Sequence, residues 1–183
     1  MKLTDNEIIM LMSQSQTSEK GLRGMMDAYQ SRLYWHIRRL IVQQDLAQDV
    51  LQDTFIKAFQ NFAQFKNDSQ LYTWLYRIAT NEALQQLAKM KKMQKADEDA
   101  EHHMQRLVAD NAEHDAEEIQ ILLQKAIQTL PEKQKLVFNI RYYDELPFEE
   151  ISKILDMSVS TCKTNYHYAK EKIENYIREN HEI

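Results

Sequence analysis

Residues 65–92 read FKNDSQLYTWLYRIATNEALQQLAKMKK, and this stretch decides how the rest of the chain is interpreted. It opens as a polar loop, in which Ser69 is predicted to cap a helix because its hydroxyl can accept a backbone N–H bond. In the helix that follows, Leu71, Leu75 and Ile78 share one side at about 3.6 residues per turn. We expect this apolar side to pack into a core.

The opposite side of the same predicted helix carries Trp74, Arg77 and Asn81. Its C-terminal end is rich in lysine, including Lys89 and Lys92. Unpaired bases stack on aromatic rings for about 1–3 kcal/mol each, and lysines bind phosphates, so this side suits nucleic acid. The alternative is a tryptophan at the edge of a helical core, with lysines that complement the helix C-terminus. This stretch alone leaves both interpretations open.

The run W-L-Y-R-I-A-T-N resembles the promoter-melting segment of bacterial RNA polymerase sigma factors, and is most similar to the small extracytoplasmic-function (ECF) group. The resemblance implies that the loop before the helix captures a flipped base of the −10 promoter element. It assigns −10 DNA binding to Phe65, Lys66, Asn67, Ser69, Tyr72, Trp74, Arg77, Asn81, Lys89 and Lys92.

The composition favours an all-α chain. Its 183 residues suffice for one ordinary domain or two small ones, and they include only two glycines and two prolines, which argues against a turn-rich β fold. The single cysteine excludes an internal disulfide and a cysteine-based zinc cluster. No segment approaches the roughly 20 apolar residues of a membrane span, so we predict a cytoplasmic protein without direct membrane insertion.

The net charge of −5 is unusual for a DNA-binding protein, but the charge is unevenly distributed. Residues 97–118 hold nine acidic residues and one arginine, which leaves the rest of the chain net basic. This asymmetry predicts an acidic flexible linker at residues 93–116, between an N-terminal domain (1–92) and a C-terminal domain (117–183). As a coil the linker would span about 25–30 Å, and at full extension about 80 Å.

Three helices are expected before residue 65. Residues 4–7 fit a capping box that starts the first one. The second carries an apolar stripe of Leu22, Met26, Tyr29, Leu33, Ile37 and Leu40, extended by Met25 and Ile41. The third is predicted to start near Asp45, with Gln48 placed for a second capping box. Its apolar side comprises Leu46, Val50, Leu51, Phe55, Ala58, Phe59 and Phe62.

The polar side of the third helix includes Asp49, Gln52 and Asp53. Asp49 and Asp53 are four residues apart, and like charges at this spacing destabilise a helix by on the order of a few tenths of a kcal/mol. That cost hints at a basic partner, although two solvated acids are the commoner case. The run D-V-L-Q-D-T-F resembles the sigma factor segment D-L-V-Q-E-V-F, which docks on a coiled coil of the polymerase β′ subunit. The resemblance assigns polymerase binding to Asp49, Gln52, Asp53 and Phe55.

The C-terminal part is predicted to contain a helix-turn-helix. A helix is expected up to Leu130, with Pro131 in the first turn of the next. A short helix at 148–155, a turn at 156–158 and a longer helix then follow, with Cys162 in the core. The N-terminal residues of the last helix would enter the major groove. This segment resembles the −35-recognition motif of sigma factors, which assigns Ser160, Thr161, Lys163, Thr164, His167 and Tyr168 to −35 DNA.

Asn165 and Tyr168 stand where arginines are common in the family. The absence of these two arginines weakens phosphate binding, and the −35 sequence cannot be read from the family average. Asp156 replaces the usual turn glycine, which aspartate can do because it tolerates a left-handed conformation.

The three resemblances occur in the family's order and cover nearly the whole chain. They predict an all-α ECF-type sigma factor of two small helical domains joined by a linker. It would bind the β′ and β subunits of core RNA polymerase, recognise −10 and −35 promoter elements, and be controlled by an anti-sigma factor. We expect neither enzyme activity nor a cofactor or metal, since histidines of the polar linker (His102, His103 and His114) are more often solvated than metal-bound.

Three alternatives compete with this interpretation. A dimeric helix-turn-helix regulator would explain residues 117–183, but not the Asp49 face or the Trp74 face. A helical adaptor that binds only proteins would not need Lys163 or Thr164 for DNA affinity. A helical enzyme would rest on scattered histidines alone.

Overall fold

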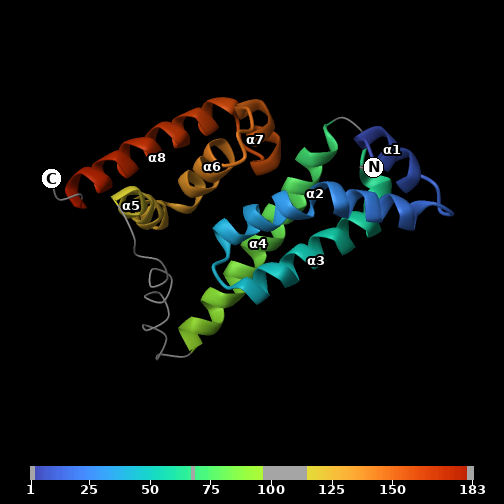
Figure 1. Cartoon of the computed structure of the whole chain (residues 1–183), viewed down its shortest axis with the longest axis horizontal. Coiled ribbons are helices and arrows are strands. Elements are labelled where there is room, and N and C mark those ends of the chain that lie inside the picture. Colours follow the sequence, from blue (N-terminus) through green and yellow to red (C-terminus); the bar gives the residue numbers. More distant parts are fainter. Residues whose placement is uncertain (1–2, 67–68, 97–114, 181–183) are drawn as a thin grey trace. The chain divides into compact units, whose positions relative to one another are not determined.

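The computed structural model describes residues 3–66, 69–96 and 115–180, in which helices dominate and no strand occurs (Figure 1). The chain divides into two compact units, built mainly from residues 1–92 and mainly from residues 93–183. The first contains α1 (Asp5–Met12), α2 (Ser18–Leu40), α3 (Gln44–Gln60), the short 3-10 helix η1 (Phe62–Gln64) and α4 (Leu71–Ala96). The second contains α5 (Asp115–Thr129), α6 (Glu132–Tyr142), α7 (Phe148–Leu155) and α8 (Val159–Asn180). The all-α prediction is confirmed; the central acidic segment, 97–114, lies outside the described residues.

Helix α1 begins with the predicted capping box. The backbone N–H of Thr4 donates to Glu7 at 2.8 Å, and the Glu7 N–H donates to the Thr4 hydroxyl at 3.4 Å. The backbone N–H of Thr4 and, after it, the Thr4 hydroxyl donate to the Glu7 carboxylate and lower the pKa of Glu7. Helix α1 then packs closely on α2, where a Cβ at Gly21 would lie 2.7 Å from the side chain of Met12. Glycine therefore allows the two helices to approach.

The core side of α2 is turned slightly from the predicted stripe. Met25 is fully buried, whereas Met26 is 36% exposed. The buried side also includes His36, whose Nε2 lies 2.8 Å from the hydroxyl of Thr80 on α4. That hydroxyl donates to the backbone carbonyl of Tyr76 at 2.7 Å. A polar pair thus sits inside a core that the sequence predicted to be apolar.

Helices α2 and α4 run side by side in the same direction. The guanidinium of Arg32 lies 5.9 Å from the ring centre of Tyr76, and one turn later His36 meets Thr80. Because both residue numbers increase together, the two helices are parallel. This register fixes which side of α4 points away from the core.

Two helix starts differ from the predictions. Helix α3 begins at Gln44 and has no side-chain cap at Gln43, so the predicted capping box of Asp45 and Gln48 is wrong. Helix α4 begins at Leu71, and the carbonyl of Gln70 accepts the first helical hydrogen bond from Trp74. The residue directly before the helix is therefore Gln70, and not Ser69 as predicted.

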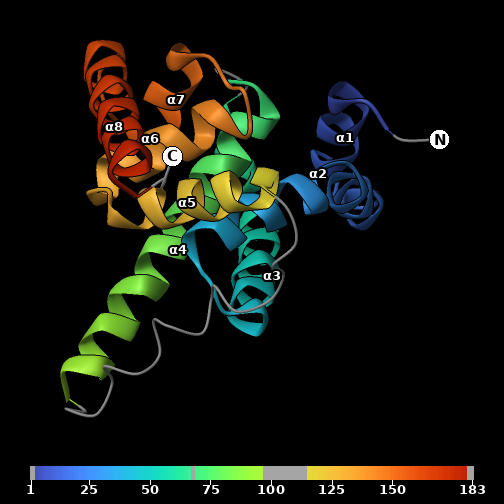
Figure 2. The ribbon, with the colours of Figure 1, turned by 60° about the vertical axis from the view of Figure 1, so that its left-hand side comes forward.

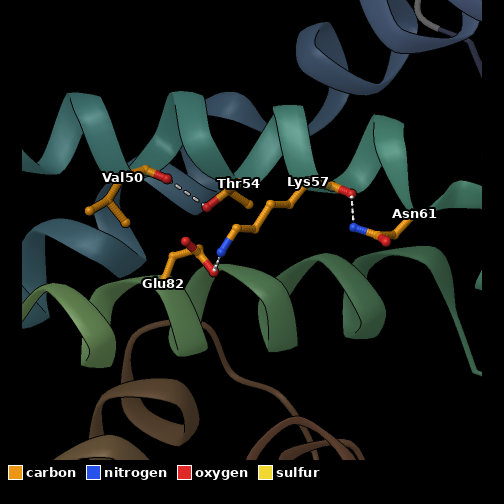
Figure 3. A network of polar contacts seen from close by, with 5 residues as sticks. All are labelled: Val50, Thr54, Lys57, Asn61 and Glu82. Carbon is orange, nitrogen blue, oxygen red and sulfur yellow. Dashed lines mark hydrogen bonds and ion pairs between the residues drawn. The ribbon is translucent and has the colours of Figure 1, made fainter.

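An ion pair joins α3 to α4 (Figure 3). The Nζ of Lys57 lies 2.5 Å from Oε1 of Glu82, and Lys57 is held on a helix where Thr54 donates to the Val50 carbonyl. The carbonyl of Lys57 accepts a bond of 2.9 Å from Asn61. A partly exposed pair of this kind contributes roughly 0–1 kcal/mol. Its main consequence is that Glu82, the only acid in the α4 sequence, is neutralised.

The second unit is a four-helix arrangement in which α8 packs along α5 and α6 (Figures 1 and 2). Its core contains Ala126, Ile127, Leu130, Phe138, Ala169 and Ile173. Pro131 lies just before α6 rather than inside its first turn, one residue earlier than predicted.

The predicted helix-turn-helix is confirmed in position and in turn chemistry. Helix α7 ends at Leu155, and Asp156 takes the left-handed conformation with φ 53° and ψ 49°. The Ser158 hydroxyl then accepts the backbone N–H of Thr161 at 3.0 Å, which caps α8. In the part of the chain that the structure describes, no helix is long and apolar enough to cross a membrane.

Candidate functional site

Trp74 belongs to a cluster of three aromatic rings at the start of α4. Its ring centre lies 5.3 Å from that of Phe65 and 5.9 Å from that of Phe62, which precede α4 in η1 and its adjoining turn. Phe62 is buried, while Phe65 and Trp74 are half-buried. Trp74 therefore packs against a buried ring while part of its surface stays exposed, and its contact with DNA remains a prediction.

The side of α4 beyond this cluster is exposed and basic. Arg77, Asn81, Lys89 and Lys92 are all exposed, as is Lys66 in the preceding loop. Two further residues predicted to bind −10 DNA, Ser69 and Tyr72, are half-buried, and Asn67 lies outside the described residues. The structure thus brings a cationic helix surface next to a half-exposed aromatic cluster.

Helix α3 presents the predicted acidic side to solvent, with Asp49, Gln52 and Asp53 exposed. Phe55 differs: only 4% of it is exposed, so its side chain belongs to the core and cannot be part of a contact surface. Ile56 was missed by the sequence interpretation, although it is 45% exposed. Its spacing of three residues from Asp53 and seven from Asp49 places it on the same side of the helix.

The six residues predicted to contact −35 DNA are all exposed on the first turns of α8: Ser160, Thr161, Lys163, Thr164, His167 and Tyr168. Cys162 is fully buried beneath them, and burial raises the pKa of its thiol, as expected for a packing residue. The amide of Asn165 donates to the Thr161 carbonyl at 2.9 Å. Asn165 is thus engaged with its own helix and does not replace the missing arginine.

Helix α7 is held in place by an arginine from α6. The guanidinium of Arg141 donates to the Leu146 carbonyl at 3.0 Å and lies 5.3 Å from the ring centre of Phe148. The Phe148 ring in turn meets Tyr166 of α8 edge to face, at 5.6 Å. These contacts fix the angle between the two helices of the helix-turn-helix.

Comparison with known proteins identifies both units. The family described as Sigma-70 region 2 matches residues 25–93, and the family described as Sigma-70, region 4 matches residues 120–173. The ECF RNA polymerase sigma-E factor of Haemophilus influenzae is 31% identical over 186 residues, which cover 97% of both chains. This chain belongs to the ECF sigma factor family. The sigma-E factor of Escherichia coli K12 is also similar, with 29% identity over 192 residues, 97% of this chain and 96% of that one.

Two solved structures share the fold of this ECF sigma factor. The sigma factor RpoE of Bartonella quintana, solved with the anti-sigma factor NepR, has a TM-score of 0.69 and 20% identity, covering 88% of this chain and 99% of that one. CnrH, solved with the cytosolic domain of CnrY, has a TM-score of 0.70 and 16% identity, covering 97% and 99%.

As an ECF sigma factor, the chain directs promoter-specific transcription initiation. The region 2 match spans α3 and most of α4, and with them the acidic side of α3 and the aromatic cluster's Trp74. The region 4 match spans the helix-turn-helix. Every candidate residue that the structure describes therefore lies within a matched segment.

Proposed function

We propose that this ECF sigma factor divides promoter selection among three surfaces. The exposed side of α3 binds core polymerase, the aromatic cluster with the basic side of α4 receives the −10 element, and the first turns of α8 read the −35 element. The observation that carries the proposal is the coexistence, in one chain, of an exposed acidic side and exposed cationic DNA-type surfaces on separate helices.

The polymerase contact is proposed for a surface that we call the α3 docking face, comprising Asp49, Gln52, Asp53 and Ile56. Two carboxylates lie one and two turns before an exposed isoleucine on the same side of the helix, which offers a basic partner both charge and an apolar anchor. Phe55 stays out of this face because it is buried; it anchors α3 to the core. By family resemblance the partner is the coiled coil of the β′ subunit, with β as a further contact.

The −10 contact is proposed for the half-exposed rings of Phe65 and Trp74 together with Arg77 and Asn81. A partly exposed ring that is already packed at one edge loses little conformational entropy when a base stacks on it, because its rotamer is fixed beforehand. Neutralisation of Glu82 by Lys57 removes the one negative charge of α4 that would repel the strand.

The −35 contact is proposed for Lys163 and Thr164, with Ser160, Thr161, His167 and Tyr168 beside them. Lysine reaches guanine edges or phosphates, and threonine contacts a base or a thymine methyl. Bond formation in RNA synthesis remains the polymerase's own chemistry. We place the protein in the cytoplasm, and propose an anti-sigma factor as a further partner because both structural neighbours were solved with a second protein bound, NepR in one case and a domain of CnrY in the other.

Run-off transcription on fragmented genomic DNA tests the proposal. Core polymerase alone and polymerase with this protein would be compared by sequencing RNA 5′ ends. New start sites that share two upstream motifs are expected, at the spacing of −10 and −35 elements. Absence of new starts, with folded protein and active core, would instead favour a regulator that binds DNA without polymerase. Gel filtration with core polymerase separates these outcomes, because such a regulator would not co-elute.

A further inference from the structure

Trp35 is an exposed aromatic residue that has no part in the three proposed surfaces. Trp35 on α2 is 56% exposed, and its ring meets Tyr34 edge to face with centres 5.5 Å apart. Arg32, one turn earlier on the same side of α2, is also exposed. A large ring fixed by a neighbour and flanked by a cation has the composition of a surface that stacks unpaired bases.

The register of α2 and α4 shows on which side of the pair Trp35 lies. Each residue of a helix is rotated by about 100° from the last. On α4, Tyr76 and Thr80 face α2, while Glu82 faces α3 through its ion pair with Lys57. Arg77 and Asn81 follow Tyr76 and Thr80 by one residue each, so they lie on the flank opposite Glu82, turned away from α3.

The sides of α2 follow from the same rotation per residue. His36 faces α4, and the buried Ile37, rotated by about +100°, turns toward the core side that α3 covers. Trp35 is rotated by about −100° and therefore lies on the other flank. Since α2 and α4 are parallel, that flank is the one that carries Arg77 and Asn81. Along the helix axis, Trp35 stands about midway between them.

We propose that Trp35 and Arg32 extend the −10 surface from α4 onto α2, with an unpaired promoter base stacking on the indole and a phosphate on the guanidinium. The inference rests on the proposed −10 role of α4. Two observations favour DNA as the occupant: the patch is cationic, and it is continuous with Arg77 and Asn81, which are themselves exposed on the same flank. In the described part of this flank, Arg32 on α2 and Arg77 on α4 are both exposed cations.

Site-specific photocrosslinking in the reconstituted holoenzyme tests this. The photoreactive residue p-benzoylphenylalanine would replace Trp35, Arg77 or Met10 in turn, on a promoter fragment found by run-off transcription and labelled on either strand. Met10 is the control, because it is 58% exposed on α1. Crosslinks to DNA are expected from positions 35 and 77 and not from position 10.

The outcomes separate this inference from the proposed function. DNA crosslinks from position 77 without any from position 35 would overturn the role of Trp35 and leave the −10 surface of α4 standing. Crosslinks from position 35 to a polymerase subunit alone would assign the patch to protein binding, and would also overturn the DNA contact of Trp35. Absence of DNA crosslinks from both positions would remove the proposed −10 role of α4, and this inference with it.

A second measurement uses the lifetime of heparin-resistant promoter complexes. Loss of one stacked base is expected to shorten it about five-fold or more in Trp35→Ala, whereas Trp35→Phe, which keeps a ring, should retain most of it. The thermal midpoint should stay unchanged because the side chain is largely exposed. Equal lifetimes for Trp35→Ala and the unaltered protein would contradict a DNA contact.

Discussion

The two units of this sigma factor position their candidate sites by different means. In the first unit, Trp74 gains its place from rings outside its own helix, since Phe62 and Phe65 hold it from the preceding segment. In the second unit, all six candidate residues for −35 DNA lie on α8. The start of this helix is set by Ser158 and by the left-handed Asp156. The first site therefore depends on tertiary packing, whereas the second depends on local turn chemistry.

The largest effect is expected from reversing charge on the α3 docking face. Asp49→Arg with Asp53→Arg should abolish co-elution with core polymerase, because two cations would then face a basic partner. The fold should persist, since both side chains are exposed. Asp27→Arg is the control, a charge reversal at an exposed position of α2. Normal run-off transcription with the double variant would disprove the docking assignment.

Truncation of the ring that supports Trp74 tests the dependence of the first site on packing. Phe62→Ala should lower the free energy of unfolding of the first unit by about 3–5 kcal/mol, as core phenylalanine truncations do. Urea unfolding followed by tryptophan fluorescence measures this, since both tryptophans lie in the first unit. Phe65→Ala is the comparison, and its half-buried ring should cost less. Equal losses in the two variants would show that Phe62 is no more central to the cluster than Phe65.

The second site should respond to the loss of exposed side chains, without any change in the core. Lys163→Ala with Thr164→Ala should weaken holoenzyme binding to its promoter by about ten-fold or more, because each good base contact contributes about 1–3 kcal/mol. The thermal midpoint should not move, since both side chains are exposed. Lys172→Ala, about two and a half turns further along α8, is the matched control. On a template with a scrambled −35 element, the double variant and the unaltered protein should bind alike; a persisting difference would point to a nonspecific role.

The sequence predicted the second unit more closely than the first, because the second site depends on local turn chemistry and the first on tertiary packing. The turn at residues 156–158 is encoded within three residues, and all six candidates on α8 are exposed as expected. Helix α3, in contrast, has apolar residues on both sides. Phe55 is buried, as the predicted apolar side of this helix indicates, although the family resemblance assigned it to polymerase binding; its neighbour Ile56 is exposed.

Polar residues inside the first core were not predictable either. His36 and Thr80 are 44 positions apart in the chain, and their hydrogen bond exists only after α2 and α4 have packed. The same holds for Lys57 and Glu82, whose pairing alters the charge of α4. Such contacts decide which side of a helix is covered, so periodicity alone misplaces residues at the edges of the apolar stripe, such as Met26.

The smallest expected effect concerns pH and the contact of α1 with α2. The hydroxyl of Tyr29 donates to the Asp5 carboxylate at 2.5 Å; burial foremost, and then this bond, raise the pKa of Tyr29 well above its usual range. As pH rises past about 10, the ordinary tyrosine pKa, the unfolded chain ionises first, so the free energy of unfolding falls. Tyr29→Phe should cost on the order of 1 kcal/mol at pH 7. Urea unfolding at pH 7 and above 10 should show this cost shrinking at the higher pH, because the phenyl ring of the variant cannot ionise and only the unaltered protein loses the stabilisation. A cost that is constant across this range would mean that the hydroxyl contributes by packing and not through its proton.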